Sequence, residues 1–528
     1  MIVPLTPVRF LYRAVDVYGK KLGVISGPCR YTYAQFGERV ERLAAGLLVE
    51  GIRPGDRVAY LSFNNSQLLE GYYGAPMVHA IVMPLNVRLA PPELIGILNH
   101  SGARMLIFES EFSPLVDVFR KACPSIERYV AIDTPVPQAD STFEELLSHS
   151  RLNRPDIFSF DENEIAELFY TSGSTGTPKG VMLSHRTIYL HALSASASAR
   201  HNETEVELHT IPLFHANGWG KPQIATMNGS RQVMVRRFEP AQVLRLIEEE
   251  QVTTMSLVPV MANALLNCPD LDRFDKSSLL DISIGGAASS PELIRGMERA
   301  FGCQVLAGYG LTETSPVASS ARIKSTVQFA SEEDRLFRMA TAGWPVIGCE
   351  IRVVDSQMRD VPRDMKSIGE VIIRGDNVMD GYYKEQQASN AAVVNGWLHT
   401  GDMALWDAEN YIHIVDRKKD IIISGGENIS SIEVEKAIFA HPAVLECAVV
   451  AAPDSKWGEV PAAIVVLKPN QQLSSHELIA FLEKQLAKFK LPGIVQFVEG
   501  PLPKTGTGKI LKRELRETFW TGKERRVQ

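Results

Sequence analysis

Short apolar runs alternate with helix-like segments through most of the chain. The segments 58–63, 81–85 and 105–108 are apolar and have the length of buried strands. Before them, Thr32 and Gln35 have the spacing of a capping box and precede apolar residues at helical intervals. Strands that alternate with helices form a mainly parallel sheet with helices on both faces. The sequence therefore predicts an α/β fold with mainly parallel sheets covered by helices.

A chain of 528 residues is too long for one hydrophobic core, so we expect two or more domains. The charged run 416–420 marks a change in pattern, and the residues after it can form a small α+β domain. The elements expected there are a helix at 432–439, strands at 447–451 and 462–467, and a helix capped by Ser474 and Glu477. We predict a large N-terminal domain over residues 1–418 and a small mobile C-terminal domain over residues 419–528.

The composition excludes several classes of protein. With 62 acidic and 55 basic side chains the net charge is -7, which gives no electrostatic basis for binding nucleic acid. The six cysteines are scattered singly, so neither structural zinc nor a disulfide framework is expected. The first residues lack the pattern of a secretory signal, and no apolar stretch reaches the ~20 residues of a transmembrane helix. These features predict a soluble, cytoplasmic protein.

A loop rich in glycine and hydroxyl side chains follows the strand-like run 165–170. Its sequence is Thr171-Ser172-Gly173-Ser174-Thr175-Gly176-Thr177-Pro178-Lys179-Gly180. Glycines let backbone N–H groups approach an anion closely, hydroxyls donate hydrogen bonds, and the lysine adds positive charge. The segment therefore predicts a site for a polyphosphate rather than a merely flexible linker.

Neither of the two common phosphate-binding signatures is present. Gly173 and Gly176 are too close for a Walker P-loop, and Lys179 precedes a glycine instead of following one. The segment Gly308-Tyr309-Gly310-Leu311-Thr312-Glu313 has a glutamate where a dinucleotide-binding fingerprint needs its third glycine. A phosphate site of a different kind is indicated.

The whole chain resembles the adenylate-forming (AMP-binding) superfamily, which contains acyl-CoA synthetases, peptide-synthetase adenylation domains and firefly-type luciferases. The resemblance rests on the loop 171–180 and on five further segments in the expected order. These are Gly308–Thr314, Thr400-Gly401-Asp402, Asp416-Arg417-Lys418-Lys419-Asp420, Gly425-Gly426-Glu427-Asn428 and Pro503-Lys504-Thr505-Gly506-Thr507-Gly508-Lys509. The acyl-CoA synthetase branch is the best match, which implies ATP and CoA as substrates and Mg²⁺ as a cofactor.

The resemblance also implies roles for individual residues around the nucleotide. Thr171 and Glu313 would bind Mg²⁺, and Lys179 would assist catalysis. Tyr309 would stack on adenine, and the backbone around Gly286, Ala287 and Gly308 would line the base. Asp402 would accept hydrogen bonds from the ribose hydroxyls, and Arg417 would add a contact at the ribose end. The residues expected to contact ATP or AMP are Thr171, Ser172, Gly173, Ser174, Thr175, Gly176, Lys179, Gly286, Ala287, Gly308, Tyr309, Gly310, Thr312, Asp402, Arg417, Lys419 and Lys509.

Two further roles implied by the resemblance belong to the C-terminal domain. Lys509 would reach the ATP site during adenylation and neutralise charge near the α-phosphate. Lys419 would act as the hinge about which the small domain rotates between the two half-reactions. The residues Gly425, Gly426, Glu427 and Asn428 would then line the CoA tunnel.

The acyl group is less sharply defined by the sequence. His215 and Trp219 resemble residues that border the acyl pocket, and a tryptophan at this place favours a medium- or long-chain fatty acid. A freestanding enzyme that loads a carrier-protein thiol is the alternative, and luciferase-like oxygenation would need an unusual substrate. Amino-acid-activating members of the superfamily generally have an aspartate in the substrate pocket that pairs with the α-amino group. Segments 214–219 and 285–290 lack an aspartate, which disfavours an amino-acid substrate. A homodimer is possible on the family resemblance alone.

Overall fold

The computed structural model describes residues 1–171, 178–425, 427–504 and 510–520, excluding the side chain of Asn428. Two compact units divide the chain. The N-terminal unit comprises Met1–Ile351, Ile373–His399 and Glu409–Ile412, and the C-terminal unit comprises Arg352–Ile372, Thr400–Ala408 and His413–Gln528. The domain boundary between residues 418 and 419 stays a prediction.

An eight-stranded sheet of the N-terminal unit contains the two strands that the predicted phosphate loop connects. Its order is β19–β9–β8–β4–β3–β5–β6–β7. The strands from β8 to β7 pair in parallel, whereas β9 pairs antiparallel with β8 and β19. The strands are β3 (Arg57–Leu61), β4 (Ile81–Pro84), β5 (Met105–Phe108), β6 (Arg128–Ala131), β7 (Ser141–Thr142), β8 (Ile165–Thr171), β9 (Lys179–Ser184) and β19 (Gly381–Tyr382).

A second, nine-stranded sheet carries the predicted adenine-binding segments. Its order is β16–β15–β14–β13–β12–β10–β11–β1–β2, parallel from β14 to β1 and antiparallel at its edges. The strands are β1 (Leu22–Ser26), β2 (Cys29–Thr32), β10 (Val206–His209), β11 (Arg231–Met234), β12 (Thr254–Leu257), β13 (Asp281–Ile284), β14 (Gln304–Gly310), β15 (Val317–Ser320) and β16 (Trp344–Pro345).

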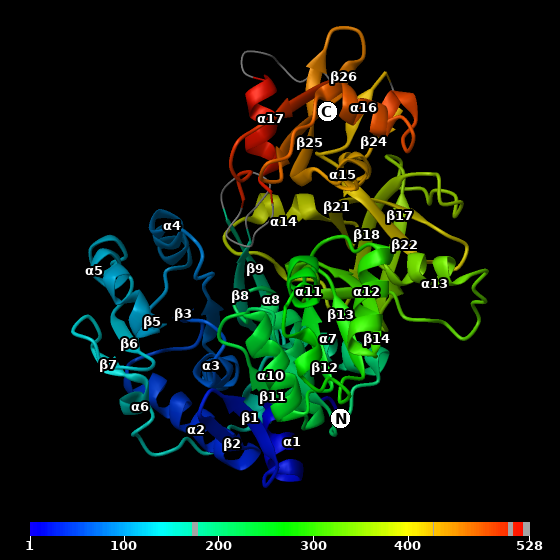
Figure 1. The fold of residues 1–528 in the computed structure, drawn as a ribbon. Helices are drawn as coiled ribbons and strands as arrows, with labels where there is room; N and C mark the ends of the chain where they lie inside the picture. Colours follow the sequence, from blue (N-terminus) through cyan, green and yellow to red (C-terminus); the bar gives the residue numbers. More distant parts are fainter. Residues whose placement is uncertain (172–177, 426, 505–509, 521–528) are drawn as a thin grey trace. The chain divides into compact units, whose positions relative to one another are not determined.

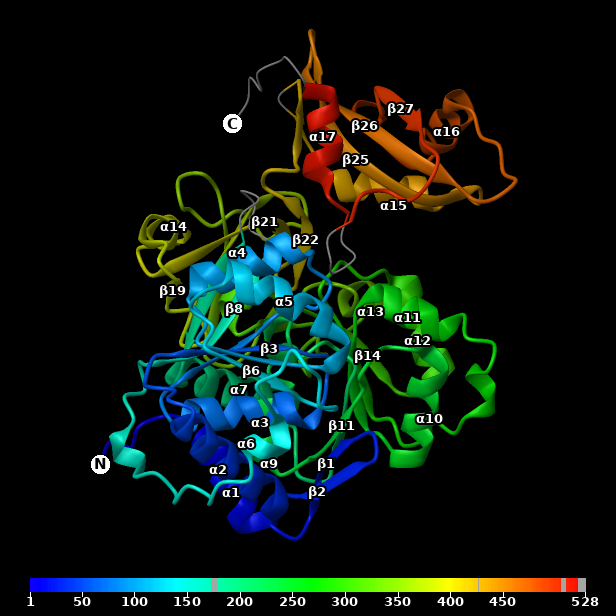
Figure 2. The ribbon, with the colours of Figure 1, turned by 90° about the vertical axis from the view of Figure 1, so that its left-hand side faces the viewer.

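Helices cover these two sheets. Figure 1 shows α10, α11 and α12 beside β12, β13 and β14, and in Figure 2 the same helices lie on one side of β14. Helix α9 packs against β10 and β11. The helices of this unit are α1 (Val8–Tyr18), α2 (Tyr33–Val49), α3 (Ser66–Met77), α4 (Pro91–Ser101), α5 (Ser113–Ala122), α6 (Phe143–Leu146), α7 (His185–Ala199), α8 (Ala216–Trp219), α9 (Lys221–Asn228), α10 (Pro240–Glu250), α11 (Pro259–Leu266), α12 (Pro291–Phe301), α13 (Glu332–Met339) and α14 (Gln386–Ala392). Short 3-10 helices occur at η1 (Ser110–Phe112), η2 (Ile157–Ser159), η3 (Leu271–Arg273) and η4 (Thr312–Thr314).

Another sheet, of five strands, has the order β17–β18–β21–β20, with β22 paired to β21. Its strands are β17 (Cys349–Val354), β18 (Gly369–Gly375), β20 (Val393–Val394), β21 (Trp397–Trp406) and β22 (Ile412–Arg417). They carry Asp402 and Arg417, two of the residues expected at the ribose.

The C-terminal unit contains a five-stranded sheet built on a long hairpin. Alternate residues of β25 and β26 face α15 and α16 on one side and α17 on the other, so apolar side chains are buried on both faces. The elements are β23 (Ile422–Ser424), β24 (Glu427–Ile429), α15 (Ser431–Phe439), β25 (Val444–Asp454), β26 (Gly458–Leu467), α16 (Ser475–Leu482), η5 (Lys488–Lys490), β27 (Ile494–Phe497) and α17 (Lys512–Trp520).

The predicted fold class is confirmed. The strands expected at 58–63, 81–85 and 105–108 are β3, β4 and β5, and the reciprocal bonds of the Thr32–Gln35 capping box open α2. Strands β25 and β26 are longer than predicted because their hairpin pairing continues from Val444 opposite Leu467 to Asp454 opposite Gly458. Among the helices that the structure describes, none is long and apolar enough to cross a membrane.

Candidate active site

The predicted phosphate loop leaves the sheet between β8 and β9. Thr171 and Lys179 are opposite each other in the last pair before the loop, so both ends of the loop are fixed by the sheet. Residues 172–177 lie outside the described residues, so the predictions for Ser172, Gly173, Ser174, Thr175 and Gly176 remain predictions.

Glu313 lies close to this hairpin through a tyrosine that the sequence analysis did not identify. The Tyr382 hydroxyl donates a hydrogen bond of 2.9 Å to Glu313 Oε1, and Lys179 Nζ is 4.9 Å from the centre of the Tyr382 ring. Tyr382 is placed by the pairing of β19 with β9, where it lies opposite Val181. Burial, and then the charge of Glu313, raise the pKa of Tyr382, so it remains a hydrogen-bond donor.

The backbone around Glu313 is held from several sides. The Glu313 carbonyl accepts a hydrogen bond of 2.9 Å from Met379 N, and Asn377 Nδ2 donates one of 3.0 Å to the carbonyl of Thr314. A Cβ at Gly310 would lie 1.8 Å from the Pro316 carbonyl oxygen, so only glycine fits this approach. The carboxylate therefore starts from a fixed backbone, although its side chain is half-buried rather than enclosed.

The predicted acyl and adenine segments meet at Trp219. A Cβ built on Gly285 would be 3.0 Å from Cη2 of the Trp219 indole, and one on Gly286 would be 3.5 Å from Cζ2. The Gly308 carbonyl oxygen is 3.2 Å from the same Gly285 position. Gly286 and Ala287 follow the end of β13, and Tyr309 and Gly310 continue β14 beyond Gly308. His215 is half-buried at the start of the turn that carries Trp219.

The two residues predicted at the ribose are paired with each other in the C-terminal unit. Arg417 Nε is 2.6 Å from Asp402 Oδ1, and Asp402 N donates a hydrogen bond of 3.0 Å to Thr400 Oγ1. The Asp402 side chain is almost fully buried, whereas the Arg417 side chain is 44% exposed. The arginine therefore holds the carboxylate from its solvent side.

The predicted hinge lies beside a cluster of charged side chains in the C-terminal unit. Arg516 of α17 donates a hydrogen bond of 2.7 Å to the Lys419 carbonyl and lies 3.4 Å from Asp420. Lys509 lies outside the described residues. The chain on either side of residues 505–509 is joined by an antiparallel bridge between Lys504 and Ile510.

The same cluster contains a buried lysine that the sequence analysis did not identify. Lys512 Nζ lies 2.7 Å from Glu435 Oε1 and donates a hydrogen bond of 2.6 Å to Ser431 Oγ. Ser431 donates from both N and Oγ to Asp416 Oδ2. Burial opposes the charge of Lys512, but the attraction of Glu435 and Asp416 outweighs it and raises the pKa of Lys512.

The predicted CoA segment joins β23 to β24, where Glu427 pairs with Ser424. Gly425 has a φ of +59°, and a Cβ there would lie 2.8 Å from the ring of the half-exposed Trp457. Glu427 is exposed. Gly426 and the Asn428 side chain lie outside the described residues.

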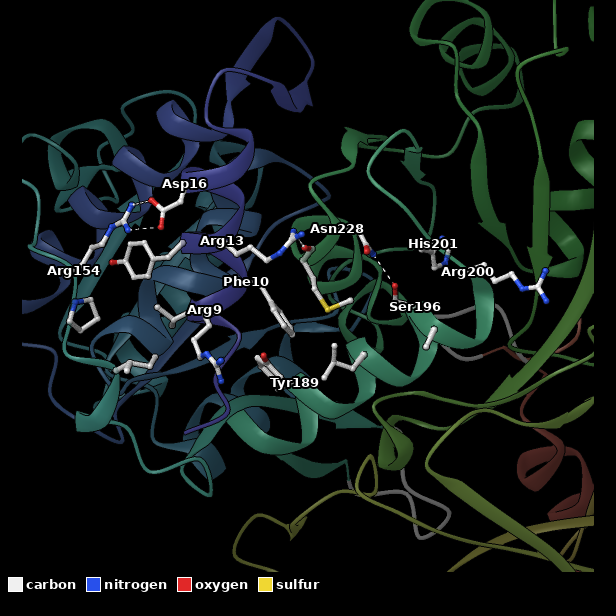
Figure 3. A pocket seen from close by; sticks show the side chains of 17 residues that line it. Arg9, Phe10, Arg13, Asp16, Arg154, Tyr189, Ser196, Arg200, His201 and Asn228 are labelled. Atoms are coloured by element: carbon white, nitrogen blue, oxygen red, sulfur yellow. Dashed lines mark hydrogen bonds and ion pairs between the residues drawn. The ribbon is translucent and has the colours of Figure 1, made fainter. Parts of the chain in front are cut away.

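A cavity of about 860 Å³ lies elsewhere in the N-terminal unit, between α1, α7 and α9 (Figure 3). None of the predicted site residues that the structure describes lines it. Two of its guanidinium groups are already engaged: Arg154 pairs with Asp16, and Arg13 donates to the Met227 carbonyl. The motifs, and not the size of this cavity, therefore locate the candidate site.

Comparisons with known proteins identify the family of the chain. The family model of the AMP-binding enzyme matches residues 11–383, and that of the AMP-binding enzyme C-terminal domain matches residues 433–509. A long-chain-fatty-acid–CoA ligase of Thermus thermophilus is 39% identical over 522 residues, which cover 97% of this chain and 95% of that protein. Feruloyl-CoA synthase of an Amycolatopsis species is 36% identical over 498 residues, with coverages of 93% and 95%.

A solved structure extends the agreement to three dimensions. The anthranilate CoA ligase AuaEII, in complex with anthranoyl-AMP, superposes with a TM-score of 0.85 at 27% identity and 98% coverage of both chains. The chain therefore belongs to the AMP-binding enzyme family, in which the relatives named here are acid–CoA ligases.

Proposed function

We propose that this protein is an ATP-dependent acyl-CoA synthetase that acts on a medium- or long-chain fatty acid. The observation that carries the proposal is the meeting of Thr171, Lys179, Tyr382 and Glu313 at the end of the β8–β9 hairpin. A cation, a hydroxyl and a half-buried carboxylate are thereby placed at the ends of a loop with the composition of a polyphosphate site.

The first half-reaction needs charge screening more than proton transfer. A fatty-acid carboxylate is already ionised at neutral pH, so its oxygen can attack the α-phosphorus without a general base. The bond between the α-phosphorus and the bridging oxygen breaks, and pyrophosphate leaves. Lys179 would offset charge on the phosphates, and Lys509 would do so near the α-phosphorus.

The donor set around Glu313 fits Mg²⁺. Glu313 Oε1 accepts the bond from Tyr382, and within the described part of the chain Oε2 has no hydrogen-bond partner. A single carboxylate with Thr171 nearby suits a cation that is bound mainly through nucleotide phosphates. Glu313 and Thr171 would hold the ion, which supplies charge neutralisation on the leaving group when bound.

The remaining predicted residues would serve the nucleotide and the second half-reaction. Asp402, supported by Arg417, would accept hydrogen bonds from the ribose hydroxyls. The CoA thiol sulfur would then attack the acyl carbonyl carbon, the bond to AMP would break, and the thiol proton would be released. Lys419 would act as the hinge between the two steps, and the Gly425–Asn428 turn would contact CoA.

The identity of the acid rests on Trp219. Its indole lies against Gly285 and Gly286, so it would separate the adenine segment from the acyl group. The relatives do not decide the substrate, because one is named for long-chain fatty acids and another for ferulate. Pocket shape alone discriminates acids weakly, at about 1–3 kcal/mol per methylene.

Pyrophosphate release tests the proposal directly. The purified protein is given ATP, Mg²⁺ and acids from butyrate to palmitate, together with benzoate and ferulate, with and without CoA. We expect turnover to require CoA and to be highest with a medium- or long-chain acid. A preference for an aromatic acid would contradict the fatty-acid assignment, and turnover with an acyl carrier protein but not with CoA would support the alternative acceptor.

A further inference from the structure

The short element α8, which carries Trp219, is a left-handed turn rather than a regular helix. Five consecutive residues have positive φ: Ala216 (44°), Asn217 (43°), Gly218 (58°), Trp219 (61°) and Gly220 (73°). Glycine adopts this conformation readily and asparagine tolerates it, but alanine and tryptophan are strained there. Such a turn persists only where surrounding contacts over-determine it.

A buried polar cluster supplies these contacts. Asn217 Oδ1 accepts a hydrogen bond of 2.6 Å from Gly220 N, which fixes the orientation of the amide. Asn217 Nδ2 then donates 3.1 Å to Glu167 Oε2, and Gln223 Nε2 donates 2.7 Å to Glu167 Oε1. All three side chains are at most 1% exposed. The turn is thus tied to β8, the strand that leads into the predicted phosphate loop.

The end of the turn is also fixed on its other side. A Cβ on Gly220 would lie 2.3 Å from Cε1 of His191, so the imidazole packs directly on this glycine. His191 Nε2 accepts a hydrogen bond of 3.1 Å from Val317 N, and burial lowers the pKa of His191 to about 3, which keeps it neutral. The Tyr72 hydroxyl holds the chain before the turn by donating a hydrogen bond of 2.6 Å to the Leu213 carbonyl.

We infer that Glu167 is a positioning residue for the acyl pocket: through Asn217 it holds the left-handed turn that places the Trp219 indole against Gly285 and Gly286. The inference rests on the proposed acyl-binding role of Trp219. Glu167 itself touches neither the Trp219 indole nor the predicted nucleotide residues through any hydrogen bond in the described part of the chain.

The cluster works best with a neutral carboxyl group. Burial raises the pKa of Glu167 to about 8, only partly offset by the bonds from Asn217 and Gln223. Gln223 Oε1 is buried and has no partner in the described part of the chain. Rotation of the Gln223 amide would let it accept the Glu167 proton, while Asn217 still donates to the other oxygen. Glutamine at position 167 reproduces this pattern, but leucine cannot.

Three variants in the full-length protein separate positioning from general damage. Glu167→Leu should raise the KM for the preferred acid by about tenfold or more, because a displaced pocket wall weakens substrate positioning, while the KM for ATP stays within about twofold. Glu167→Gln should retain wild-type values. Glu70→Gln is the matched control, because Glu70 of α3 is equally buried but pairs with Arg39 of α2. It should leave the ranking of acids unchanged.

A further variant, at Asn217, keeps the inference testable if Glu167→Leu does not fold. Asn217→Gly retains a residue that favours positive φ but removes the link to Glu167, so it should raise the KM for the acid severalfold. The inference would be overturned if folded Glu167→Leu or Asn217→Gly kept the wild-type ranking of acids and the wild-type KM for the acid. It would also be overturned if Glu167→Gln raised this KM as much as Glu167→Leu does. The wild-type acid profile is read separately, so an aromatic preference would overturn the fatty-acid assignment without deciding the role of Glu167.

Discussion

One glutamate, Glu167, is bonded to the turn that carries Trp219, and another, Glu313, lies near the end of the β8–β9 hairpin. The surroundings of these two carboxyl groups are opposite in kind. Glu167 is fully buried between two neutral amides, and its surroundings favour the uncharged form. Glu313 is half-buried, accepts one hydrogen bond from a tyrosine, and forms no ion pair with a cation in the described part of the chain. The first arrangement suits a group that acts through shape, and the second leaves a charge available to a ligand.

The comparison extends to the C-terminal unit. Lys512 is enclosed by Glu435, Ser431 and Asp416, so its charge is used within the fold. Lys509, three residues earlier in the chain, is the lysine proposed to act on the nucleotide. Neutralising Lys509 or Glu313, whose charges are proposed to act on the nucleotide or its metal ion, should therefore lower the rate of adenylation. Neutralising Glu167, which is proposed to act through shape, should leave this rate unchanged.

The largest effect is expected at Lys509. Lys509→Ala should reduce acyl-adenylate formation by roughly 10²–10³, because a transition-state charge is lost. Thioester formation from preformed acyl-AMP should be nearly unchanged. The two half-reactions are measured separately by pyrophosphate release and by acyl-CoA formation, and equal losses in both would contradict the proposed role.

Glu313→Gln should lower adenylation by about 10², because glutamine keeps the hydrogen bond with Tyr382 but cannot offer a carboxylate to Mg²⁺. The dependence of the rate on Mg²⁺ concentration should shift to higher concentrations. The matched substitution Glu167→Gln should leave both quantities unchanged, and a similar loss in the two variants would remove the distinction between them.

Lys419→Pro should impair thioester formation by about tenfold more than adenylation, because proline fixes φ at the proposed hinge. Lys419→Ala removes the predicted nucleotide contact but leaves the backbone free, so it should leave the ratio of thioester formation to adenylation unchanged. If alanine is as harmful as proline, the side-chain charge matters rather than the backbone.

Tyr382→Phe should lower adenylation roughly fivefold, the rate equivalent of one hydrogen bond worth about 1 kcal/mol. The ring remains beside Lys179, so ATP binding should change little. Steady-state kinetics with varied ATP would show the effect in kcat. A change confined to the KM for ATP would place Tyr382 in nucleotide binding instead.

Glu167→Gln should have the smallest effect on rate and a clear effect on stability as a function of pH. The pKa of Glu167 is about 8 in the fold against 4.5 for the free group, so the folded state binds the extra proton between these values. Wild-type stability from this group is therefore lost as pH rises through the window, at up to about 1.4 kcal/mol per unit. In thermal unfolding from pH 5 to pH 9, the stability of the variant relative to the wild type should increase with pH. A stability difference that does not change with pH would contradict a neutral carboxyl group at Glu167.

Much of the fold was predictable because local patterns and tertiary structure agree. The capping box at Thr32 and Gln35, the apolar strands and the charged run before the C-terminal elements all have a local cause. The lengths of β25 and β26 were underestimated because pairing across a hairpin, and not local composition, decides where these strands end.

The site was only partly predictable from the sequence. The ends of the phosphate loop were identified from composition and Gly308–Thr314 from the resemblance to the family. Tyr382 was not identified, because its partners Glu313 and Lys179 are distant in sequence. The motif Gly381-Tyr382-Tyr383 offered only an aromatic pair after a glycine. Glu167 was hidden inside an apolar strand, where its burial becomes apparent only from the three-dimensional structure.

Acid-dependent exchange of labelled pyrophosphate into ATP, without CoA, tests the central claim most directly when wild type, Glu313→Gln and Glu167→Gln are compared with the preferred fatty acid. We predict exchange in the wild type and in Glu167→Gln, and a loss of about 10² in Glu313→Gln. The account would be contradicted if no acid supports exchange in the wild type, or if Glu313→Gln exchanges as fast as Glu167→Gln.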